Sequence, residues 1–378
     1  MYKMTKHKEI IINFKNLEHN LITIKSHVHK KELVATLKAD AYGHGLIQTF
    51  KFFKEKNINY FGLFSIYDAL KLRKIDKKSN ILLYINNINK NAIKNLVNFE
   101  ITPFVADSQY LSLIEEECKR QNKKIKVHLK VDVGMNRYGI KTENALNLAT
   151  KIQDSKLVEF EGICTHLPTT ENTKITQTQS KKFDYLINEL KNKNINPKFI
   201  HISNSGHITN YKISEKFNMI RPGLILYGYH PNPNNQNNNL KLKPVLNLYS
   251  KVIFIKNIKK GDQISYSGLF KAKEDMQIGL IPVGYFDGIP QNTSKNFYCI
   301  IKDKKCFIRG KICMNISIIE IPQDLKINIG DKVEIVSERL SLDILSKESG
   351  RSTYELLCSI GKNEKKNTYI KLPKESNF

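Results

Sequence analysis

The chain has 378 residues, which exceeds the size of one ordinary hydrophobic core and predicts two domains. Its formal net charge of +25 would suit a nucleic-acid-binding protein. However, only seven of its 61 basic residues are arginine, and no patch interleaves arginine with aromatic residues. We therefore interpret the charge as a solvated lysine surface with no nucleic-acid partner, and a polyanion site is the less favoured alternative.

The cysteines and the N-terminal segment bear on the cellular compartment. The six cysteines form no Cys-x-x-Cys pair and no zinc-binding spacing, which predicts a reducing compartment and no metal site. The apolar cluster at residues 10–12 is too short for a signal peptide, and no apolar run reaches the length of a membrane span. These features predict a soluble, cytoplasmic protein without a membrane partner.

Short apolar or β-branched runs alternate with helical patterns over the first 230 residues or so. Residues 108–120, which follow a cap at Asp107 and Ser108, and residues 173–190 have helical spacing. Eight strands alternating with helices fit an α/β fold of the (β/α)8 barrel type, like a TIM barrel, better than the alternative of an open, doubly wound sheet. The predicted strands are residues 33–37, 60–65, 81–85, 102–106, 127–131, 160–165, 199–202 and 224–227.

An asparagine-rich segment at residues 231–239 cannot bury apolar area and predicts a linker. After it, short strands broken by Gly-Asp turns predict a mainly β domain. The expected domains are therefore a barrel at 1–235 and a C-terminal β domain at 236–378. The strands predicted in the second domain are residues 245–255, 277–283, 297–301, 306–308, 316–321 and 332–335.

Lys38 ends the first predicted strand and opens a glycine-containing loop. Lysine is rarely buried, and burial lowers its pKa, which makes a neutral amine available as a nucleophile for a Schiff base. The alternative is a lysine whose amine merely reaches solvent from the strand end.

Other polar residues fall at the ends of the predicted strands, where a barrel builds its active site. They are Lys130 with the loop that carries Arg137, His166, the segment with Asn204 and Ser205, and Arg221 at the start of the predicted eighth strand. Tyr42, Ser205 and the backbone N–H groups of Gly206 and Gly223 predict a phosphate-binding cradle. A Schiff-base lysine beside a phosphate site indicates pyridoxal 5'-phosphate (PLP) as the cofactor.

Residues 38–45, Lys38-Ala39-Asp40-Ala41-Tyr42-Gly43-His44-Gly45, resemble the PLP motif of alanine racemases, which are PLP enzymes of fold type III. The resemblance continues in order almost to the end of the chain. The matching segments are residues 128–137, 165–166, 201–205, 221–228, 242–246, 264–266, 281–288, 310–314 and 353–358.

This resemblance implies PLP-dependent interconversion of L- and D-alanine, which supplies D-alanine for peptidoglycan. Lys38 would hold the cofactor and act as base on one face of the substrate Cα, and Tyr266 from the second subunit would serve the other face. A homodimer is therefore expected. Phenol is a weak base unless positive charge favours the phenolate, and the family places His166 and Arg221 nearby for that purpose.

The remaining site residues are also implied by the resemblance. Arg221 would face the pyridine nitrogen and, as a permanent donor, keep it unprotonated. Arg137 and the Met314 backbone N–H would bind the substrate carboxylate, Lys130 is a candidate for carbamylation, and Tyr354 and Tyr285 would narrow the entrance. The implied cofactor-binding residues are Lys38, Tyr42, His166, Asn204, Ser205, Arg221, Gly223 and Tyr354.

The sequence departs from the family pattern at several positions. Asn315 replaces the usual Asp, Gln291 stands where Arg is frequent, and residues 167–171 and 362–368 differ from the usual motifs. Three alternatives remain at this point: a PLP-dependent decarboxylase, a non-catalytic PLP carrier, and a racemase that prefers serine or has broad specificity. The motifs after residue 245 argue against the carrier, which lacks a β domain.

Overall fold

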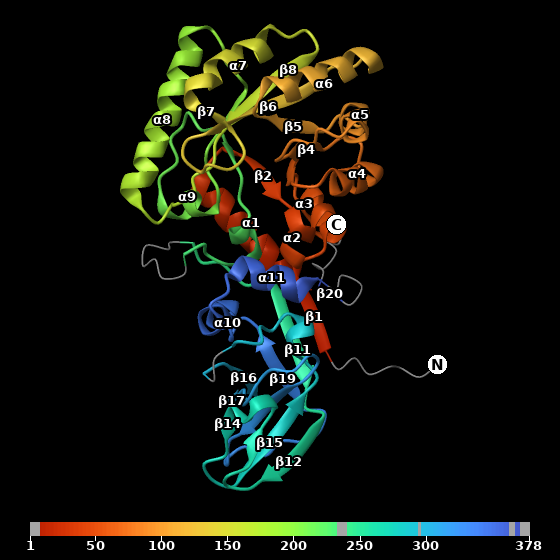
Figure 1. Cartoon of the computed structure of the whole chain (residues 1–378), viewed down its shortest axis with the longest axis vertical. Helices are drawn as coiled ribbons and strands as arrows, with labels where there is room; N and C mark the ends of the chain where they lie inside the picture. The colour runs from red at the N-terminus through yellow and green to blue at the C-terminus, as the bar shows by residue number, and fades with distance from the viewer. Residues whose placement is uncertain (1–7, 233–239, 294–295, 363–366, 371–378) are drawn as a thin grey trace, which may run out of the picture.

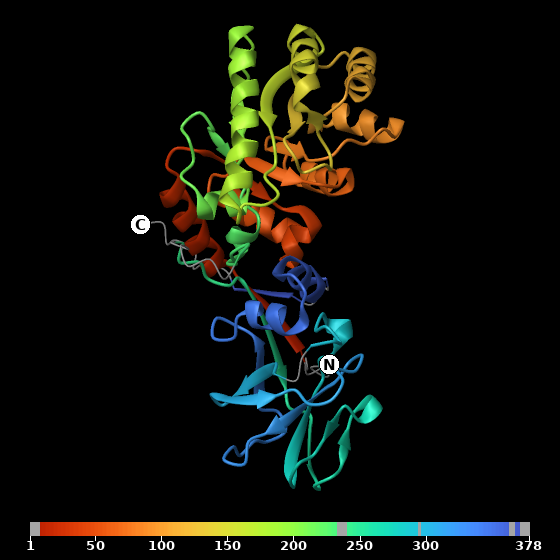
Figure 2. The same cartoon turned by 60° about the vertical axis from the view of Figure 1, so that its left-hand side comes forward.

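The computed structural model describes residues 8–232, 240–293, 296–362 and 367–370. Within these residues the chain forms a barrel with helices around it and an elongated, mainly β part below it (Figure 1). The turned view shows the same two parts, with helix α11 (Thr353–Gly361) where they meet (Figure 2). The predicted linker lies outside the described residues except at 231 and 232.

The barrel contains eight parallel strands in a nearly closed ring, which confirms the predicted (β/α)8 architecture. Strands pair in the order β10-β2-β3-β4-β5-β6-β8-β9. The ring is completed by hydrogen bonds from Ile200 N to Asn218 Oδ1 and from Arg221 N to Ser203 O, both 2.9 Å. The strands are β2 (Glu32–Thr36), β3 (Tyr60–Leu63), β4 (Asn80–Leu83), β5 (Thr102–Val105), β6 (Ile125–Asp132), β8 (Val158–Cys164), β9 (Phe199–His201) and β10 (Met219–Ile220), and β7 (Ile140–Lys141) pairs with β6.

Amphipathic helices cover the outside of the barrel. The helix predicted at 108–120 is α6, and its Asp107 cap accepts a hydrogen bond from Tyr110 N at 2.7 Å. The helix predicted at 173–190 is α8. The helices of this part are α1 (Phe14–Val28), α2 (Lys38–Gly43), α3 (Leu46–Glu55), α4 (Ile66–Ile75), α5 (Lys90–Asn98), α6 (Ser108–Gln121), α7 (Thr142–Asp154), α8 (Thr173–Asn192) and α9 (Ser205–Asn210).

The prediction for the eighth strand was wrong. Residues 224–227 form a 3₁₀ helix, η1 (Leu224–Tyr227), and the eighth strand is the two-residue β10 before it. A buried apolar run does not by itself distinguish a strand from a turn of helix, and η1 is buried against α1. As a consequence, Arg221 follows the eighth strand and lies at its carboxyl end, on the same rim as the other predicted site residues.

The C-terminal part is mainly β, as predicted, but the run 245–255 forms two strands, β11 and β12. The N-terminal strand β1 (Lys8–Asn13) joins its largest sheet, whose order is β17-β16-β19-β11-β1-β20, so the exact domain limits remain a prediction. The other elements are β11 (Leu246–Lys251), β12 (Phe254–Ile258), β13 (Gln263–Ile264), η2 (Tyr266–Gly268), β14 (Phe270–Lys271), β15 (Met276–Ile281), η3 (Tyr285–Asp287), β16 (Tyr298–Ile301), β17 (Lys304–Phe307), β18 (Ser317–Ile321), β19 (Lys332–Val336), α10 (Leu342–Ser349) and β20 (Asn367–Ile370).

The inside of the barrel is a packed layer and not an open channel. Inward side chains from seven of the eight strands form one buried cluster, and β6 contributes His128 at this level. The layer closes the barrel beneath the carboxyl ends of the strands. The cluster consists of Val34, Tyr60, Leu82, Phe104, Cys164, Phe199 and Met219.

Candidate active site

A cavity of about 430 Å³ lies at the carboxyl ends of the barrel strands. It is lined by ten of the fourteen residues predicted from the sequence, although they come from segments more than 300 residues apart. Tyr266, Met314, Tyr285 and Gly206 do not line it. The ten are Lys38, Tyr42, Lys130, Arg137, His166, Asn204, Ser205, Arg221, Gly223 and Tyr354.

Lys38 is positioned by one turn of left-handed helix. Residues 39–42 have φ of 53–55° and ψ of 39–54°, although none of them is glycine. Left-handed backbone costs about 1–2 kcal/mol for each such residue, so the surrounding structure must stabilise this turn. Asp40 Oδ1 accepts a hydrogen bond from Leu46 N at 2.7 Å, and His44 Nδ1 donates to Ala41 O and Tyr42 O at 2.9 Å.

Helix α11 packs directly against this turn. A Cβ at Gly361 would lie 2.0 Å from Gly43 O, and a Cβ at Gly43 would lie 2.4 Å from Leu357 O. The two backbones therefore touch where a side chain on either glycine would separate them. Because α11 also carries Tyr354 into the cavity, one contact fixes both Lys38 and Tyr354.

The cavity is strongly electropositive. Lys38, Lys130, Arg137 and Arg221 line it, and no carboxylate from the described residues does. Burial and then the charge of Arg137 lower the pKa of Lys38. Burial, followed by the charges of Arg221 and Arg137, lowers the pKa of Lys130 to about 8. Both amines are therefore easier to deprotonate than an ordinary lysine.

The loop after β6 places Arg137 at the cavity. Asp132 accepts hydrogen bonds from Gly134 N at 2.8 Å, Met135 N at 2.7 Å and Arg137 N at 3.2 Å. Burial alone would raise the pKa of Asp132, but these backbone donors lower it. Asp132 is thus an ionised group that shapes the loop, and the Arg137 guanidinium has no hydrogen bond to another described residue.

Arg221 is buried and held by acceptors. Its Nη1 donates to His201 Nδ1 at 2.7 Å and to His201 O at 3.1 Å, and its Nη2 donates to Thr165 O at 2.6 Å. These bonds fix the plane of the guanidinium. Nη2 also donates to Ile202 O at 3.5 Å. Among the described residues Nε has no acceptor, which leaves one of the five donors for a ligand.

His166 is neutral near pH 7. Burial and then the charges of Arg221 and Lys130 lower its pKa to about 2. Asn204 Nδ2 lies 3.4 Å from His166 Nε2 and donates to Leu167 O at 2.9 Å. Burial among other cations therefore disfavours the cationic form of His166, and the expectation that it favours a tyrosine phenolate stays a prediction.

Hydroxyl groups and a glycine form a small polar cradle in the cavity wall. Ser205 Oγ accepts a hydrogen bond from Gly223 N at 2.9 Å. A Cβ at Gly223 would lie 2.4 Å from Tyr42 Oη, so only glycine leaves this space open. Gly206, which the sequence also suggested for the cradle, does not line the cavity.

Tyr266 and Met314 lie on the surface of the C-terminal part, with 68% and 54% of their surface exposed. The segments that carry them lie side by side, because Ser265 Oγ donates to Lys311 O at 2.6 Å and lies 3.6 Å from Cys313 Sγ. The residues that flank Tyr266 have left-handed backbone, with φ of 64° at Ser265 and 63° at Ser267. Unusual backbone at an exposed tyrosine is typical of a functional position.

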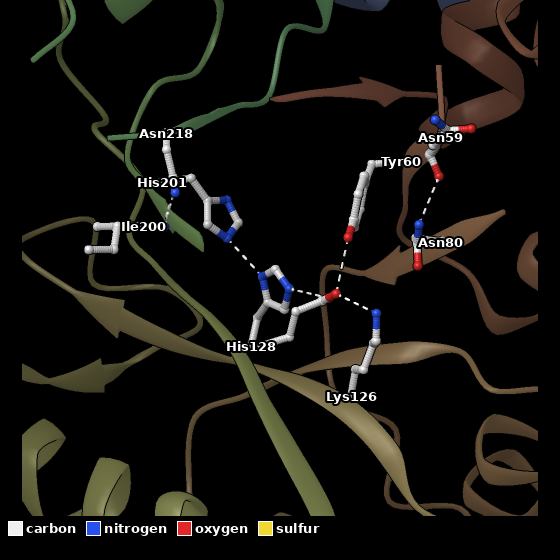
Figure 3. A network of polar contacts seen from close by, with 9 residues as sticks. Asn59, Tyr60, Asn80, Lys126, His128, Ile200, His201 and Asn218 are labelled. Carbon is white, nitrogen blue, oxygen red and sulfur yellow. Dashed lines mark hydrogen bonds and ion pairs between the residues drawn. The ribbon is translucent and has the colours of Figure 1, made fainter. Parts of the chain in front are cut away.

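Sequence reasoning missed several residues of the cavity wall and the polar chain below it. Tyr84, Thr36, Phe104 and Tyr138 line the cavity, and Tyr84 Oη lies 3.2 Å from Thr36 Oγ1. Arg221 also contacts a buried network of His201, His128 and Glu161. Figure 3 shows the contact between His201 and His128. Strand periodicity could have indicated His128, since it lies two residues before Lys130 and so shares its face of β6.

The described residues contain no group of three or more His, Cys, Asp or Glu placed to hold a metal ion. None of the helices in the same residues is long and apolar enough to cross a membrane.

Comparison with known proteins agrees with this geometry. Residues 12–231 match the family model described as alanine racemase, N-terminal domain, and residues 245–368 match alanine racemase, C-terminal domain. The alanine racemase of Borreliella burgdorferi (strain ZS7) is 64% identical over 363 residues, covering 96% of this chain and 97% of the relative. The alanine racemase of Treponema denticola is 32% identical over 372 residues, covering 93% of this chain and 95% of the relative.

Solved structures support the same fold. The alanine racemase of Clostridium difficile 630 superimposes with a TM-score of 0.87 at 28% identity and covers 95% of this chain and 94% of that one. The alanine racemase of Streptomyces lavendulae superimposes with a TM-score of 0.91 at 20% identity and covers 98% of this chain and 99% of that one, which shows a shared fold.

Proposed function

Since the chain belongs to the alanine racemase family and is an enzyme that racemises alanine, we propose that it does so with PLP and two bases, Lys38 and Tyr266. The observation that carries the proposal is the charge of the cavity. Four basic side chains, two of them arginine, line it without a carboxylate among the described residues. Such a site favours a ligand with several negative charges, and PLP bound together with an amino acid carries a phosphate and a carboxylate.

The residues present fit this cofactor. Lys38 has a lowered pKa and no hydrogen-bond partner among the described residues, as a covalent attachment point requires. Ser205, Tyr42 and Gly223 offer hydroxyl groups and an open space for a phosphate, with Asn204, His166 and Tyr354 alongside. When bound, PLP would supply the electron sink that makes the substrate Cα proton acidic.

The roles of the side chains follow from their chemistry. Lys38, as a neutral amine, would accept or return the Cα proton on one face. Arg221 would donate to the ring nitrogen and, because arginine does not deprotonate, would keep that nitrogen unprotonated and limit transamination. Arg137, whose guanidinium is unpaired among the described residues, would bind the substrate carboxylate together with the Met314 backbone N–H.

We include carbamylation of Lys130 in the proposal. Carbon dioxide reacts with a neutral amine, and the pKa of Lys130 is lowered to about 8. The modification would replace one of four clustered positive charges with a negative one. A carboxylate on Lys130 would then attract Arg137, whereas a cationic Lys130 repels it.

The second base requires a second subunit. Tyr266 is exposed and lies away from the cavity of its own chain, so we propose a homodimer in which the partner's Tyr266 completes the site. Two further apolar side chains of the C-terminal part are also exposed, Leu269 at 70% and Phe286 at 61%. Apolar exposure of this kind suits a protein interface. Arg221 then remains as the nearby positive charge that could favour the phenolate, because His166 is neutral.

The physiological proposal is the supply of D-alanine for peptidoglycan in the cytoplasm, with no nucleic-acid partner. The departures at Asn315 and Gln291 fall on exposed residues outside the cavity, so they leave the groups assigned to the chemistry in place.

The test is to incubate the purified protein with PLP and L-alanine or L-serine in deuterium oxide, and to follow chirality and Cα deuterium together. We expect D-alanine with deuterium at Cα. Release of carbon dioxide would favour a decarboxylase, absence of exchange would favour a carrier, and faster turnover of serine would indicate different specificity.

Two further measurements examine the mechanism. The Tyr266→Phe variant should lose most of its racemase activity, and full activity would contradict the two-base assignment. A fully active monomer in sedimentation velocity would contradict the shared site.

A further inference from the structure

A chain of buried polar side chains runs through the barrel interior and ends at Arg221. Arg221 Nη1 contacts His201 Nδ1 at 2.7 Å. His201 Nε2 contacts His128 Nδ1 at 2.8 Å (Figure 3). His128 Nε2 contacts Glu161 Oε2 at 3.0 Å. Both histidines are fully buried and Glu161 is 1% exposed, so this chain is closed to solvent.

The two ends of the chain fix the direction of every hydrogen bond. Arginine can only donate, so His201 Nδ1 must accept and His201 Nε2 carries the proton. His128 Nδ1 must then accept and His128 Nε2 donates to Glu161, which as a carboxylate can only accept. One consistent arrangement exists, with both histidines neutral. Burial lowers the pKa of both His128 and His201, in agreement with this assignment.

The surroundings hold the chain in this geometry. The ring of His128 stacks on Phe104 at a centroid distance of 5.8 Å and on Phe199 at 6.4 Å. A Cβ at Gly162 would lie 2.6 Å from the His128 ring, so glycine is required beside it. The rings therefore have little freedom to flip, and the proton positions depend on the groups at the two ends.

Glu161 is fixed as an anion by two further donors. Tyr60 Oη donates to its Oε1 at 3.0 Å, and Lys126 Nζ donates to the same oxygen at 2.7 Å. Burial alone would raise the pKa of Glu161, but hydrogen bonds from His128 and Lys126 lower it to about 2. Because a carboxylate can only accept, Glu161 sets the direction of the hydrogen bonds from the end of the chain that is remote from the cavity.

We propose that Glu161 is a positioning residue for Arg221, acting through the tautomers of His128 and His201. Its carboxylate requires the proton on His128 Nε2, which leaves Nδ1 of His201 as an acceptor for the guanidinium. Glu161 touches neither cofactor nor substrate. This inference rests on the proposed function, in which Arg221 faces the cofactor ring.

Replacement of Glu161 by glutamine tests the direction of the chain. In glutamine the amide oxygen can keep the hydrogen bonds from Tyr60 Oη and Lys126 Nζ, which turns the amide N–H group toward His128 Nε2 and favours the reversed order of protons. His201 would then present an N–H to Arg221, and two donors would face each other. The guanidinium would lose an acceptor and could rotate away from its position.

The experiment is nitrogen NMR of the holoenzyme labelled with ¹⁵N-histidine, recorded for wild type, Glu161→Gln and Tyr60→Phe. In wild type we expect unprotonated Nδ1 on both His128 and His201. Tyr60→Phe removes one donor to the same carboxylate and serves as the matched control, so its histidine tautomers should match wild type. Glu161→Gln should show a protonated Nδ1 on His201.

Two readouts then connect the tautomers to Arg221. In Glu161→Gln we expect a changed absorption spectrum of bound PLP and a fall in kcat of about tenfold with little change in KM, the size expected for losing one hydrogen bond to a charged group. Tyr60→Phe should change neither.

The possible results separate the two proposals. If His201 Nδ1 is protonated in wild type, the inference is overturned without any variant. The test therefore remains possible even if Glu161→Gln does not fold. Unaltered tautomers and PLP spectrum in a folded Glu161→Gln also overturn it. A protein that racemises alanine without PLP overturns the proposed function instead, and the tautomer result still stands.

Discussion

Replacement of Gly361 by alanine should reduce activity by moving the turn that carries Lys38. The new Cβ would lie 2.0 Å from Gly43 O and 2.5 Å from Gly43 Cα. Van der Waals contact lies near about 3.5 Å, so α11 and the left-handed turn must separate by more than about 1 Å. Overpacking of this kind costs about 1–3 kcal/mol of unfolding free energy, and a displacement of about 1 Å at a reacting group can reduce the rate about 100-fold.

The assay for Gly361→Ala combines alanine racemisation by circular dichroism with urea unfolding. Gly330→Ala is a suitable control, because Gly330 has φ of +97° and no atom within 4 Å of the added Cβ. It should lose about 1–2 kcal/mol of stability through backbone strain alone and keep its kcat. A folded Gly361→Ala with wild-type kcat/KM, or with no greater loss than the control, would refute the reasoning.

Three further predictions concern charge and space in the barrel. Because the pKa of Lys130 is about 8, its carbamylation should increase as the pH rises toward 8. Enzyme depleted of carbon dioxide should therefore lose activity and regain it when bicarbonate is added. A ¹³C NMR signal of the carbamate checks this, and full activity without that signal would contradict it. Glu161 has a folded-state pKa of about 2, below its ordinary value of 4.5, so its ionised form stabilises the fold above pH 4.5 and this contribution is lost as the pH falls toward 2. Wild type should therefore lose more unfolding free energy than Glu161→Gln between about pH 5 and 3, measured by urea titration, and parallel losses would oppose the assignment. Gly223→Ala should weaken PLP binding about 10-fold or more, since its Cβ would lie 2.4 Å from Tyr42 Oη, and a fluorescence titration giving the wild-type Kd would argue against the cradle.

The sequence predicted those parts of the site that depend on strand ends. Lys38, Lys130 and His166 follow or end apolar runs, and parallel strands bring such residues to one rim, where the structure has them. The same reasoning misplaced the eighth strand, because residues 224–227 are as apolar as a strand while β10 has only two residues.

Features that depend on long-range contact were beyond prediction. The left-handed turn at residues 39–42 contradicts the local preference of its side chains and depends on α11, about 320 residues later in the chain. The charge state of His166 depends on its burial beside Arg221, and the spacing of residues along the sequence does not indicate this burial. Glu161 gave no signal of its own, because its role depends on two histidines from other strands.

The position of β1 has a consequence for biosynthesis. Ile11 of β1 pairs with Asn247 of β11 on one side and with Thr368 of β20 on the other. A ribosome adds about 5–20 residues per second, so β1 waits roughly 20–70 s for its last neighbour. During that interval the apolar segment at residues 10–12 has an unpaired edge, which is a template for aggregation. The nascent chain should therefore depend on chaperone binding near its N-terminus, although the finished protein buries Ile10 and Ile12 almost completely.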